Sequence, residues 1–260
     1  QISQIPLVDK FFASGDNLKK WFNNLNFKRF WHESNKIMFV LYFFFYLKKY
    51  GNEQLTFQAS KNISVLLNLL NNSQDPETGF WGTNHTSDLY NSCFGAAHIY
   101  IFYDYLNMEI PFVEKIIDNT LKLHHANGLI KTKYGGACED YNAIEIYLRC
   151  SNQTDYRRNE ILEVLSKMKK IISGSQNNDG GYPYKIAHNI FQNFGFNNVL
   201  KREYTYSSWE KMKTLSFKSD LWATWFRLLS IKVINYLLEG NEEFNSYDLP
   251  AWGFIKKQEK

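Results

Sequence analysis

The sequence predicts an all-α fold, an α/α toroid of about five helix pairs joined by glycine-rich turns. Three observations carry this prediction. Proline is scarce, with 5 in 260 residues, while long stretches have the apolar periodicity of helices. A similar turn follows three of these helices at intervals of about 50 residues. The predicted helices also alternate between amphipathic segments and segments that are apolar nearly all round.

Helical periodicity assigns the elements of the N-terminal half in order. The first helix covers about residues 16–26, and the second, very apolar one covers 33–50. The third covers 58–72, where leucines recur at helical spacing. The fourth covers 87–106 with Ser87 or Thr86 as its cap, and the fifth covers 111–124 with Pro111 in its first turn. The longest apolar run, residues 37–47, is shorter than the roughly 20 residues that cross a bilayer.

The C-terminal half repeats this arrangement. A glycine-containing loop, residues 126–136, leads to a sixth helix over about 139–149 and a seventh over 156–173. A less regular stretch follows, and a strongly apolar last helix covers about 219–238. We therefore expect a single domain over residues 1–260. Because the chain begins at Gln1 without a methionine, we also expect it to be a fragment or one domain of a longer protein, with companion domains.

Three turns share one pattern, in which a Gln or His precedes a short polar turn and a glycine, usually followed by an aromatic residue. They occupy Ser73–Trp81, His124–Leu129 and Ser175–Tyr182. Glycine supplies the left-handed backbone conformation that ends a helix. A fixed period of helix, glycine turn and helix indicates a repeat that must stack or close to bury its apolar faces.

The helices after these turns carry their few polar residues near the N-terminal end. These residues are Asp88, Asn91, Glu139, Asp140, Asn142 and Asp220. Helices that are apolar all round are buried on all sides. In a ring of helix pairs they form the inner ring, so their polar starts gather at one mouth of a central cavity. This geometry predicts a single candidate site.

Two of the turns carry a family resemblance. Gln176–Tyr182 and Gln74–Trp81 resemble the repeat of the prenyltransferase and squalene/terpene cyclase superfamily, in which a Gln precedes a Gly-Gly or Gly-x-Trp turn. The resemblance covers roughly residues 55–240 and implies the α/α toroid. Residues 135–140 and 219–227 are also similar to uncharacterised bacterial proteins of this repeat type, some linked to surface-glycan or lipid biosynthesis.

Glu139 and Asp140 are the first candidates for acid chemistry. The resemblance implies that a cyclase protonates an alkene or epoxide with an Asp of a D-x-D-D motif at the start of an inner helix. Such an acid must stay protonated in an aromatic-lined cavity whose rings stabilise a cation. Asp140 and Asn142 match the first half of that motif, but Ala143 replaces its closing Asp. The structural alternative is a first helical turn, where acidic residues favour the helix dipole.

The fourth helix contributes a second set of candidates. Asp88, Asn91 and His98 stand at i, i+3 and i+10, roughly one face, which we place toward the lumen. A histidine on an apolar helix also occurs as a core residue with its hydrogen bonds satisfied. Both interpretations of His98 stay open at this point.

The last helix adds Asp220, Trp222 and Arg227. Asp220 either caps this helix or takes part in the site. Arg227 lies in a helix that we expect to be buried, and an unpaired buried guanidinium is very costly. It therefore pairs with a carboxylate such as Asp140 or Glu145, or it binds an anionic ligand.

The loops at the predicted mouth supply aromatic and hydrogen-bonding side chains. These are His85, Tyr134, Tyr182, Tyr184 and Trp209, and Trp81 adds a further ring to the pocket wall. With 17% aromatic residues, the chain has rings both for an aromatic pocket and for a core in which Phe and Tyr replace Leu. Aromatic platforms beside Asp, Glu and Asn suit sugar rings as well as isoprenoids.

Charge and cysteine content limit the partners and location. The 30 basic and 26 acidic residues give a net charge of +4 without a long basic block, so nucleic acid is not an expected partner. Cys93, Cys138 and Cys150 lack CxxC spacing, which indicates reduced thiols in a cytoplasmic protein. For protein prenyltransferases, the resemblance implies a zinc site with an Asp-x-Cys pattern. This pattern is absent from the sequence. We expect no metal, no cofactor and no transmembrane segment.

Three functions remain as hypotheses. The first is a prenyltransferase-like or terpene-cyclase-like enzyme acting on a hydrophobic or glycolipid substrate, with Asp140, Glu139 and Asp220 as its polar or catalytic groups. The second is a toroid that acts on a cell-surface polysaccharide or its precursor as a lyase, epimerase or hydrolase. The third is a non-catalytic binding or scaffold domain of a larger enzyme. Because a fold does not determine chemistry, the site must decide between them.

Overall fold

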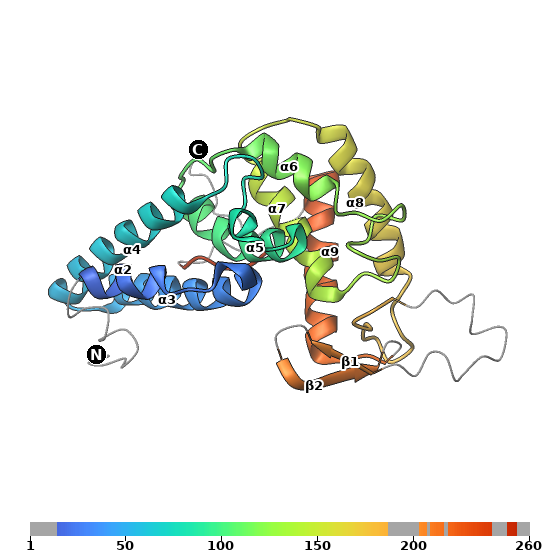
Figure 1. Cartoon of the computed structure of the whole chain (residues 1–260). Helices are drawn as coiled ribbons and strands as arrows, with labels where there is room; N and C mark the ends of the chain where they lie inside the picture. The colour runs from blue at the N-terminus through green and yellow to red at the C-terminus, as the bar shows by residue number, and fades with distance from the viewer. Residues whose placement is uncertain (1–14, 187–202, 207–208, 216–217, 241–248, 254–260) are drawn as a thin grey trace. The chain divides into compact units, whose positions relative to one another are not determined.

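A computed structural model describes residues 15–186, 203–206, 209–215, 218–240 and 249–253 of the chain. Its α-helices, in chain order, are α2 (Gly15–Asn23), α3 (Phe30–Tyr50), α4 (Glu53–Ser73), α5 (Leu89–Tyr105), α6 (Val113–Leu121), α7 (Ala137–Ser151), α8 (Arg158–Ser173) and α9 (Leu221–Glu239). Two short 3-10 helices, η1 (Phe27–Arg29) and η2 (Thr83–His85), connect the early elements. The fold is predominantly helical, as the sequence predicts (Figure 1).

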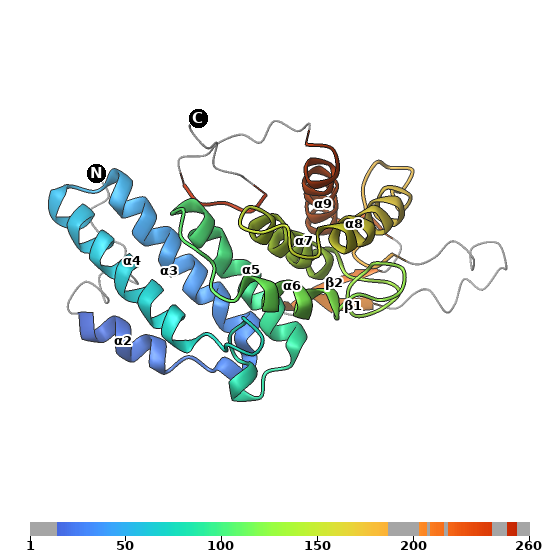
Figure 2. The ribbon, with the colours of Figure 1, turned by 90° about the horizontal axis from the view of Figure 1, so that it is seen from above.

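The chain divides into two compact units. The first comprises residues 1–116 and 244–260, and the second comprises residues 117–243. In the first unit, α3 packs against both α4 and α5, and α2 packs against α4 (Figure 2). The core of this unit is strongly aromatic, since Phe30, Trp81 and Tyr100 are fully buried. Phe and Tyr thus take much of the packing role that Leu has in other helical cores.

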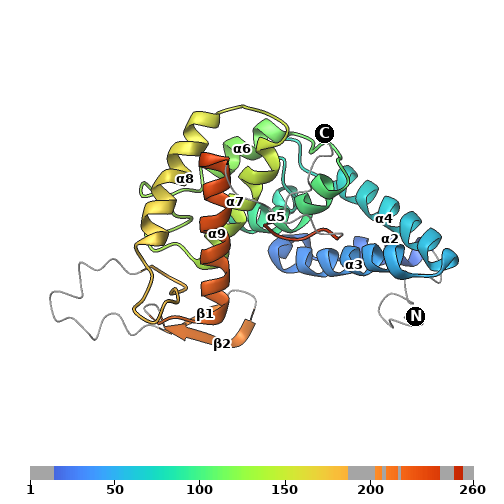
Figure 3. The same ribbon diagram turned by 180° about the vertical axis from the view of Figure 1, so that it is seen from behind.

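In the second unit, α9 packs against α7 and α8 (Figure 3). Helix α7 is buried along nearly its whole length, as expected for an inner helix, whereas α8 buries one stripe only. The strands β1 (Glu203–Tyr206) and β2 (Trp209–Leu215) form an antiparallel hairpin with an irregularity between Thr205 and Tyr206. This hairpin lies in the stretch that helical periodicity leaves unassigned, and its sequence is rich in the aromatic and β-branched residues that favour strands.

The three repeated turns have the same internal hydrogen bond. In each, the Gln or His side chain donates to the carbonyl oxygen of the turn glycine. The pairs are Gln74 Nε2 to Gly79 (2.7 Å), His124 Nδ1 to Gly128 (2.5 Å) and Gln176 Nε2 to Gly180 (2.8 Å). The three glycines have φ values of 74°, 90° and 83°, the left-handed region that other residues adopt at a cost.

The backbone of the turns repeats as well. In each turn the amide that follows the Gln or His donates to the carbonyl of the residue after the glycine. The pairs are Asp75 to Phe80 (2.8 Å), His125 to Leu129 (2.7 Å) and Asn177 to Gly181 (2.9 Å). The repeat inferred from the sequence is therefore a repeat of local structure.

The cap of the fourth helix differs from the prediction. The cap of α5 is Asp88, which accepts the N–H of Asn91 (2.7 Å). The predicted caps, Ser87 and Thr86, do not have this role. Thr86 has a φ of 66° and belongs to the end of η2, so it does not start the next helix. Asp88 has the extended backbone that a capping residue needs, and its carboxylate is a strong acceptor for the first free amides.

Hydropathy gives one further result. None of the helices within the described residues is long and apolar enough to cross a membrane. Closure of the helix pairs into a ring, and the single domain expected from the sequence, stay predictions.

The His124 turn predicts a pH effect. Burial lowers the pKa of His124 from 6.5 to about 4, although its bond to Gly128 opposes the shift. Its ring is therefore neutral when folded but becomes protonated below about pH 6.5 when unfolded, so stability is lost as pH falls below that value. His124→Gln copies the other two turns and removes the titrating group. In the wild type, we expect the free energy of unfolding to fall between pH 7 and pH 5. In His124→Gln this fall should be smaller, by at most about 2 kcal/mol, as measured by urea denaturation.

The neighbouring residue provides the control for this measurement. His125 is exposed, so His125→Gln should leave the pH profile as in the wild type. An equal loss of stability in the wild type and in His124→Gln would show that another group is responsible.

Candidate functional site

Asp140 is fully buried in the first turns of α7, and both of its oxygens have donors. Oδ1 accepts the N–H of Ile130 (2.8 Å), and Oδ2 accepts the N–H of Gly136 (3.2 Å), the residue that precedes the helix. Gly136 is the N-cap of α7, so this bond gives a partner to one of the backbone amides at the helix start that have none within the helix. The Asp140 carboxylate thus holds the loop 130–136 against the N-terminal end of α7.

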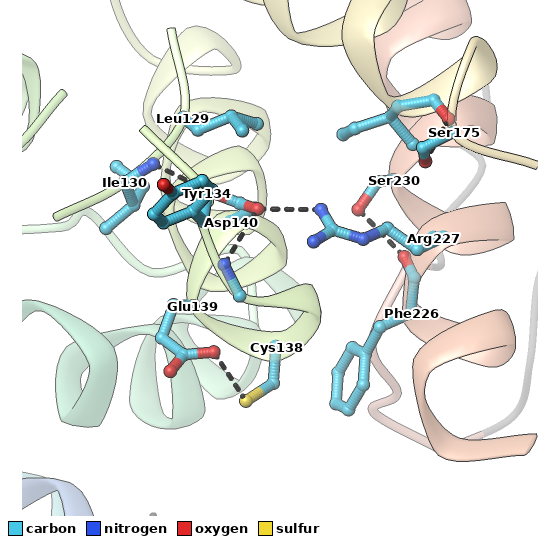
Figure 4. A network of polar contacts seen from close by, with 12 residues as sticks. Leu129, Ile130, Tyr134, Cys138, Glu139, Asp140, Ser175, Phe226, Arg227 and Ser230 are labelled. Atoms are coloured by element: carbon cyan, nitrogen blue, oxygen red, sulfur yellow. Dashed lines mark hydrogen bonds and ion pairs between the residues drawn. The ribbon is translucent and has the colours of Figure 1, made fainter. Parts of the chain in front are cut away.

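The third partner of Asp140 is Arg227 of α9. Nη1 of Arg227 donates to Asp140 Oδ2 at 2.6 Å, and both side chains have 0% exposure. Nη2 of Arg227 donates to the carbonyl oxygen of Tyr184 (2.8 Å). Of the two roles predicted for Arg227, the structure shows pairing with Asp140. Figure 4 shows the guanidinium and the carboxylate facing each other between α9 and α7.

Opposing effects act on the protonation of Asp140, and together they raise the pKa of its carboxyl. Burial raises the pKa of Asp140, whereas Arg227 and the Ile130 amide oppose that rise. A guanidinium keeps its proton in proteins, so a neutral Asp140 would leave Arg227 as a buried cation without a counter-charge. Asp140 is therefore a structural anion in this arrangement, which differs from the protonated acid that cyclase chemistry requires.

Two adjacent glycines allow the carboxylates to approach the backbone. A Cβ at Gly135 would lie 2.3 Å from Asp140 Oδ2, and a Cβ at Gly136 would lie 2.2 Å from Glu139 Oε2. Gly135 also has a φ of 56°. Glycine is thus favoured at position 135 both by the turn and by the buried Asp140 carboxylate, whereas at position 136 the partly exposed Glu139 side chain could move aside.

Glu139 points away from Asp140 and belongs to a second group of polar contacts. Its Oε2 accepts the hydroxyl of Tyr184 (2.7 Å) and the thiol of Cys138 (3.2 Å). Cys138 and Tyr184 are buried, whereas Glu139 is partly exposed. Burial and the negative charge of Glu139 raise the pKa of both the Cys138 thiol and the Tyr184 hydroxyl, so both stay protonated donors. Figure 4 shows Glu139 turned toward Cys138.

A second buried ion pair lies along α7 and was not predicted as such. Glu145 and Arg149, 0% and 1% exposed, pair at i and i+4, with Arg149 Nε 3.0 Å from Glu145 Oε1. Tyr141 also donates its hydroxyl to Glu145. Glu145 is therefore the partner of Arg149 and not of Arg227. The i, i+4 spacing of opposite charges is a sequence signal that identifies this pair.

Several predicted candidates belong to the first unit and have structural partners there. Trp81 is fully buried and donates its indole N–H to the carbonyl of Leu70 (2.8 Å). His98 is 2% exposed, and its Nδ1 lies 2.9 Å from Ser34 Oγ. Burial lowers the pKa of His98 to about 3, so its ring is neutral at physiological pH. His98 has the environment of a core histidine.

The remaining candidates of the first unit lie around the start of α5. Asp88 caps the helix and binds the amide side chain of Asn91 (2.8 Å) as well as its backbone N–H. His85 is exposed, with its ring 5.6 Å from that of Phe27. Asp88 and Asn91 thus have the contacts of a helix cap. For acidic residues at helix starts, such a structural role is the alternative to a functional site.

Around α9, Asp220 also acts as a cap. It accepts the N–H of Ala223 (2.7 Å), the first of the two roles considered for it. Tyr182 is buried beside this cap, and its N–H donates to Thr224 Oγ1 (2.9 Å). Trp222 is partly buried, and its ring lies 5.0 Å from that of Phe226.

Three candidates remain in the second unit. Tyr134 is partly exposed, and its carbonyl accepts the N–H of Ile186 (2.9 Å). Asn142 is 2% exposed on α7. Trp209 begins β2, but its side chain lies outside the part of the chain whose side chains the structure describes. In the described ranges, no three His, Cys, Asp or Glu side chains are grouped as metal ligands.

The buried pair predicts a clear mutational pattern. Asp140→Asn removes the counter-charge of Arg227, and we expect the free energy of unfolding to fall by about 3–5 kcal/mol. Replacing both partners, in Asp140→Leu/Arg227→Met, removes both buried charges and should recover most of that loss. Urea denaturation followed by circular dichroism measures each variant.

A surface pair provides the matched control for these variants. Asp155 is 83% exposed in its pair with Arg158, so Asp155→Asn should change stability by less than about 1 kcal/mol. A double variant as unstable as Asp140→Asn would indicate that the site needs these polar groups for more than charge balance.

Comparisons with known proteins add no relatives. No protein-family model, curated protein or solved structure matches the chain. The resemblance to prenyltransferases and terpene cyclases thus stays an expectation, and the functional argument depends on the geometry of the site.

Proposed function

We propose that the chain is a non-catalytic binding or scaffold domain built on α/α-toroid repeats of the prenyltransferase and terpene cyclase type. One observation carries the proposal: the carboxylate expected to act as an acid, Asp140, accepts three internal donors, Arg227 and two backbone amides. A group whose lone pairs already serve internal donors, and whose charge balances a buried cation, is poorly suited to donate a proton to a ligand.

The other acidic candidates support the same conclusion. Asp220 and Asp88 each accept a backbone N–H at a helix start, at 2.7 Å in both cases. Trp81, expected in the pocket wall, is part of a packed core. These three candidates therefore have roles in holding the fold, as expected for a domain that functions through its surface.

The ring closure in this proposal has its own support. The three turns share their hydrogen bonds, and α5 and α7, which follow two of them, are buried nearly all round. Helices buried on all sides need neighbours on all sides, which a closed ring of pairs supplies.

Glu139 favours a second candidate function. It is a partly exposed acidic group of the predicted catalytic set, and its carboxylate accepts two side-chain donors, Tyr184 and Cys138. In this alternative the chain is an enzyme for a hydrophobic or glycolipid substrate, and Glu139 exchanges a proton with it. For hydrolysis, the polysaccharide alternative needs a second available carboxylate opposite the first. Within the described residues, the candidates Asp140, Asp88 and Asp220 already have structural partners.

Complementation distinguishes the two functions. In a strain that lacks the gene and shows a growth or envelope defect, we expect Glu139→Gln and Asp140→Leu/Arg227→Met to restore the wild-type phenotype. Neither variant removes a catalytic group if the domain binds without catalysis. Protein levels measured by immunoblotting control for folding. A stable Glu139→Gln protein that fails to complement, beside a double variant that succeeds, would refute the binding role and support the enzyme.

A further inference from the structure

The first two turns of α7 carry two oxygen atoms that have no hydrogen-bond donor within the described residues. The Tyr184 hydroxyl and the Cys138 thiol both donate to Glu139 Oε2, at 2.7 and 3.2 Å, and leave Oε1 without a donor. Oδ1 of Asn142 is buried without a hydrogen-bonding partner, in a residue that is 2% exposed. Because an unpaired buried acceptor is costly, we expect a donor from outside the chain at Asn142.

Helix geometry brings these two oxygens to one side of α7. Asn142 stands three residues after Glu139 and four after Cys138, and side chains at these spacings share a face. Helical side chains also lean toward the N-terminal end of their helix, so the Asn142 amide is directed back toward the turn of Glu139 and Cys138. Figure 4 shows the Glu139 carboxylate and the Cys138 thiol facing each other in that turn. We call Glu139, Asn142, Cys138 and Tyr184 the α7 polar site.

Exposure gives the α7 polar site an open side and a closed side. Glu139 is partly exposed, whereas Cys138, Tyr184 and Asn142 are 8%, 2% and 2% exposed. A ligand group therefore meets the Glu139 carboxylate first and reaches Asn142 as it becomes buried. A few polar groups on a buried wall fix the orientation of a small ligand.

The neighbouring acidic residues already have counter-charges. Asp140 pairs with Arg227, and Glu145, one turn beyond Asn142, pairs with Arg149. Glu139 differs from both, because its two donors are a neutral hydroxyl and a neutral thiol. Among the described residues, it has no ion pair. The α7 polar site therefore carries one negative charge that the described part of the chain does not balance.

The lysines of the segments that form the site have other contacts. Lys133, in the loop before α7, lies over the ring of Tyr134, with its Nζ 5.1 Å from the ring centroid. Lys131 in the same loop and Lys185, which follows Tyr184, each have an interaction of their own. None of these ammonium groups is bonded to Glu139 in the described structure.

Donor number and charge together select the ligand group. A single hydroxyl has one hydrogen to donate, whereas an ammonium group has three N–H donors and no acceptor. One ammonium group therefore serves Glu139 Oε1 and Asn142 Oδ1 together and also balances the negative charge. A water molecule has two hydrogens to donate, but it leaves the charge of Glu139 unbalanced.

We propose that the α7 polar site binds a primary ammonium group, carried by a small amine or by a lysine side chain of another protein. Glu139 Oε1 accepts one N–H in a charge-assisted hydrogen bond, and Asn142 Oδ1 accepts a second. Tyr184 and Cys138 hold the carboxylate in place. This ligand is additional to the proposed binding function. Its test measures binding directly and does not use the cellular phenotype, so the failure of one proposal does not imply the failure of the other.

Ligand-observed NMR titration of the purified chain at pH 7 tests the proposal. Ethylammonium chloride is the probe. Tetramethylammonium chloride has the same charge without N–H donors, and ethylene glycol has two donors without a charge. We expect ethylammonium to bind with a Kd on the order of 10 mM, and both analogues to bind at least about tenfold more weakly.

A second probe identifies the source of the ammonium group. Nα-acetyl-lysinamide carries the same group on a lysine side chain and is titrated in parallel. Tighter binding than that of ethylammonium assigns the site to a protein lysine, and weaker binding assigns it to a small amine.

Two variants test the two acceptors separately. Glu139→Gln keeps the shape of the side chain but removes its charge, and it should weaken ethylammonium binding at least about tenfold. Asn142→Leu removes the buried acceptor and should weaken binding about fivefold. Glu163 of α8 has a side chain that is 67% exposed, so Glu163→Gln is the matched control and should leave binding unchanged. Circular dichroism shows whether each variant stays folded.

Four results would overturn the proposal. Absence of ethylammonium binding would leave Asn142 to an internal water molecule. Equal binding of ethylammonium and tetramethylammonium would show an attraction to charge alone. Equal affinities of the wild type and a folded Glu139→Gln would place the amine elsewhere. Displacement of ethylammonium by potassium chloride, but not by choline chloride at the same concentration, would assign the site to a metal cation.

Discussion

The buried ion pair between Asp140 and Arg227 is the constraint on which the second unit depends. A carboxylate and a guanidinium removed from water lose their hydration, and their mutual attraction and their hydrogen bonds must offset that loss. Among the described residues, only Nε of the Arg227 guanidinium is left without such a bond. Here the partners come from the loop before α7, from α9 and from the carbonyl of Tyr184. Segments far apart in sequence must therefore assemble together, and the pair specifies that arrangement as well as balancing charge.

The three repeated turns have the same local structure, but the segments that follow them differ in length and in structure. After the turn glycine, the next buried helix begins 10 residues later at α5 (79 to 89), 9 later at α7 (128 to 137) and 41 later at α9 (180 to 221). The third interval contains the hairpin. Helix α9 also differs from α5 and α7, because one side supplies Arg227 to the core while the other exposes apolar side chains. Specialisation is concentrated in the third repeat.

Sequence reasoning anticipated the site in part. Periodicity located the helices, and the cost of an unpaired buried guanidinium led to a carboxylate partner for Arg227. The sequence did not distinguish Asp140 from Glu145 as the partner of Arg227, because helical spacing does not show which face of α7 contacts α9. The thiol of Cys138 and the carbonyl of Tyr184 were missed, since their roles come from chain segments that meet only after folding. Trp81 was expected in a pocket wall, but it is fully buried in a core in which aromatic rings replace leucines. Of the two interpretations left open for His98, the structure shows the buried core residue.

The sequence by itself determined the helices, the glycine turns and the repeat, because these depend on backbone preferences and contacts within a few residues. Tertiary structure alone decided which carboxylate carries a structural charge, which one keeps access to solvent, and which side of α9 is left uncovered. Glu139 and Asp140 are neighbours of the same chemical type, yet Asp140 has 0% exposure beside Arg227 while Glu139 is partly exposed. The physical reason is that burial and charge pairing are properties of the surroundings of a residue, and those surroundings come from distant parts of the chain.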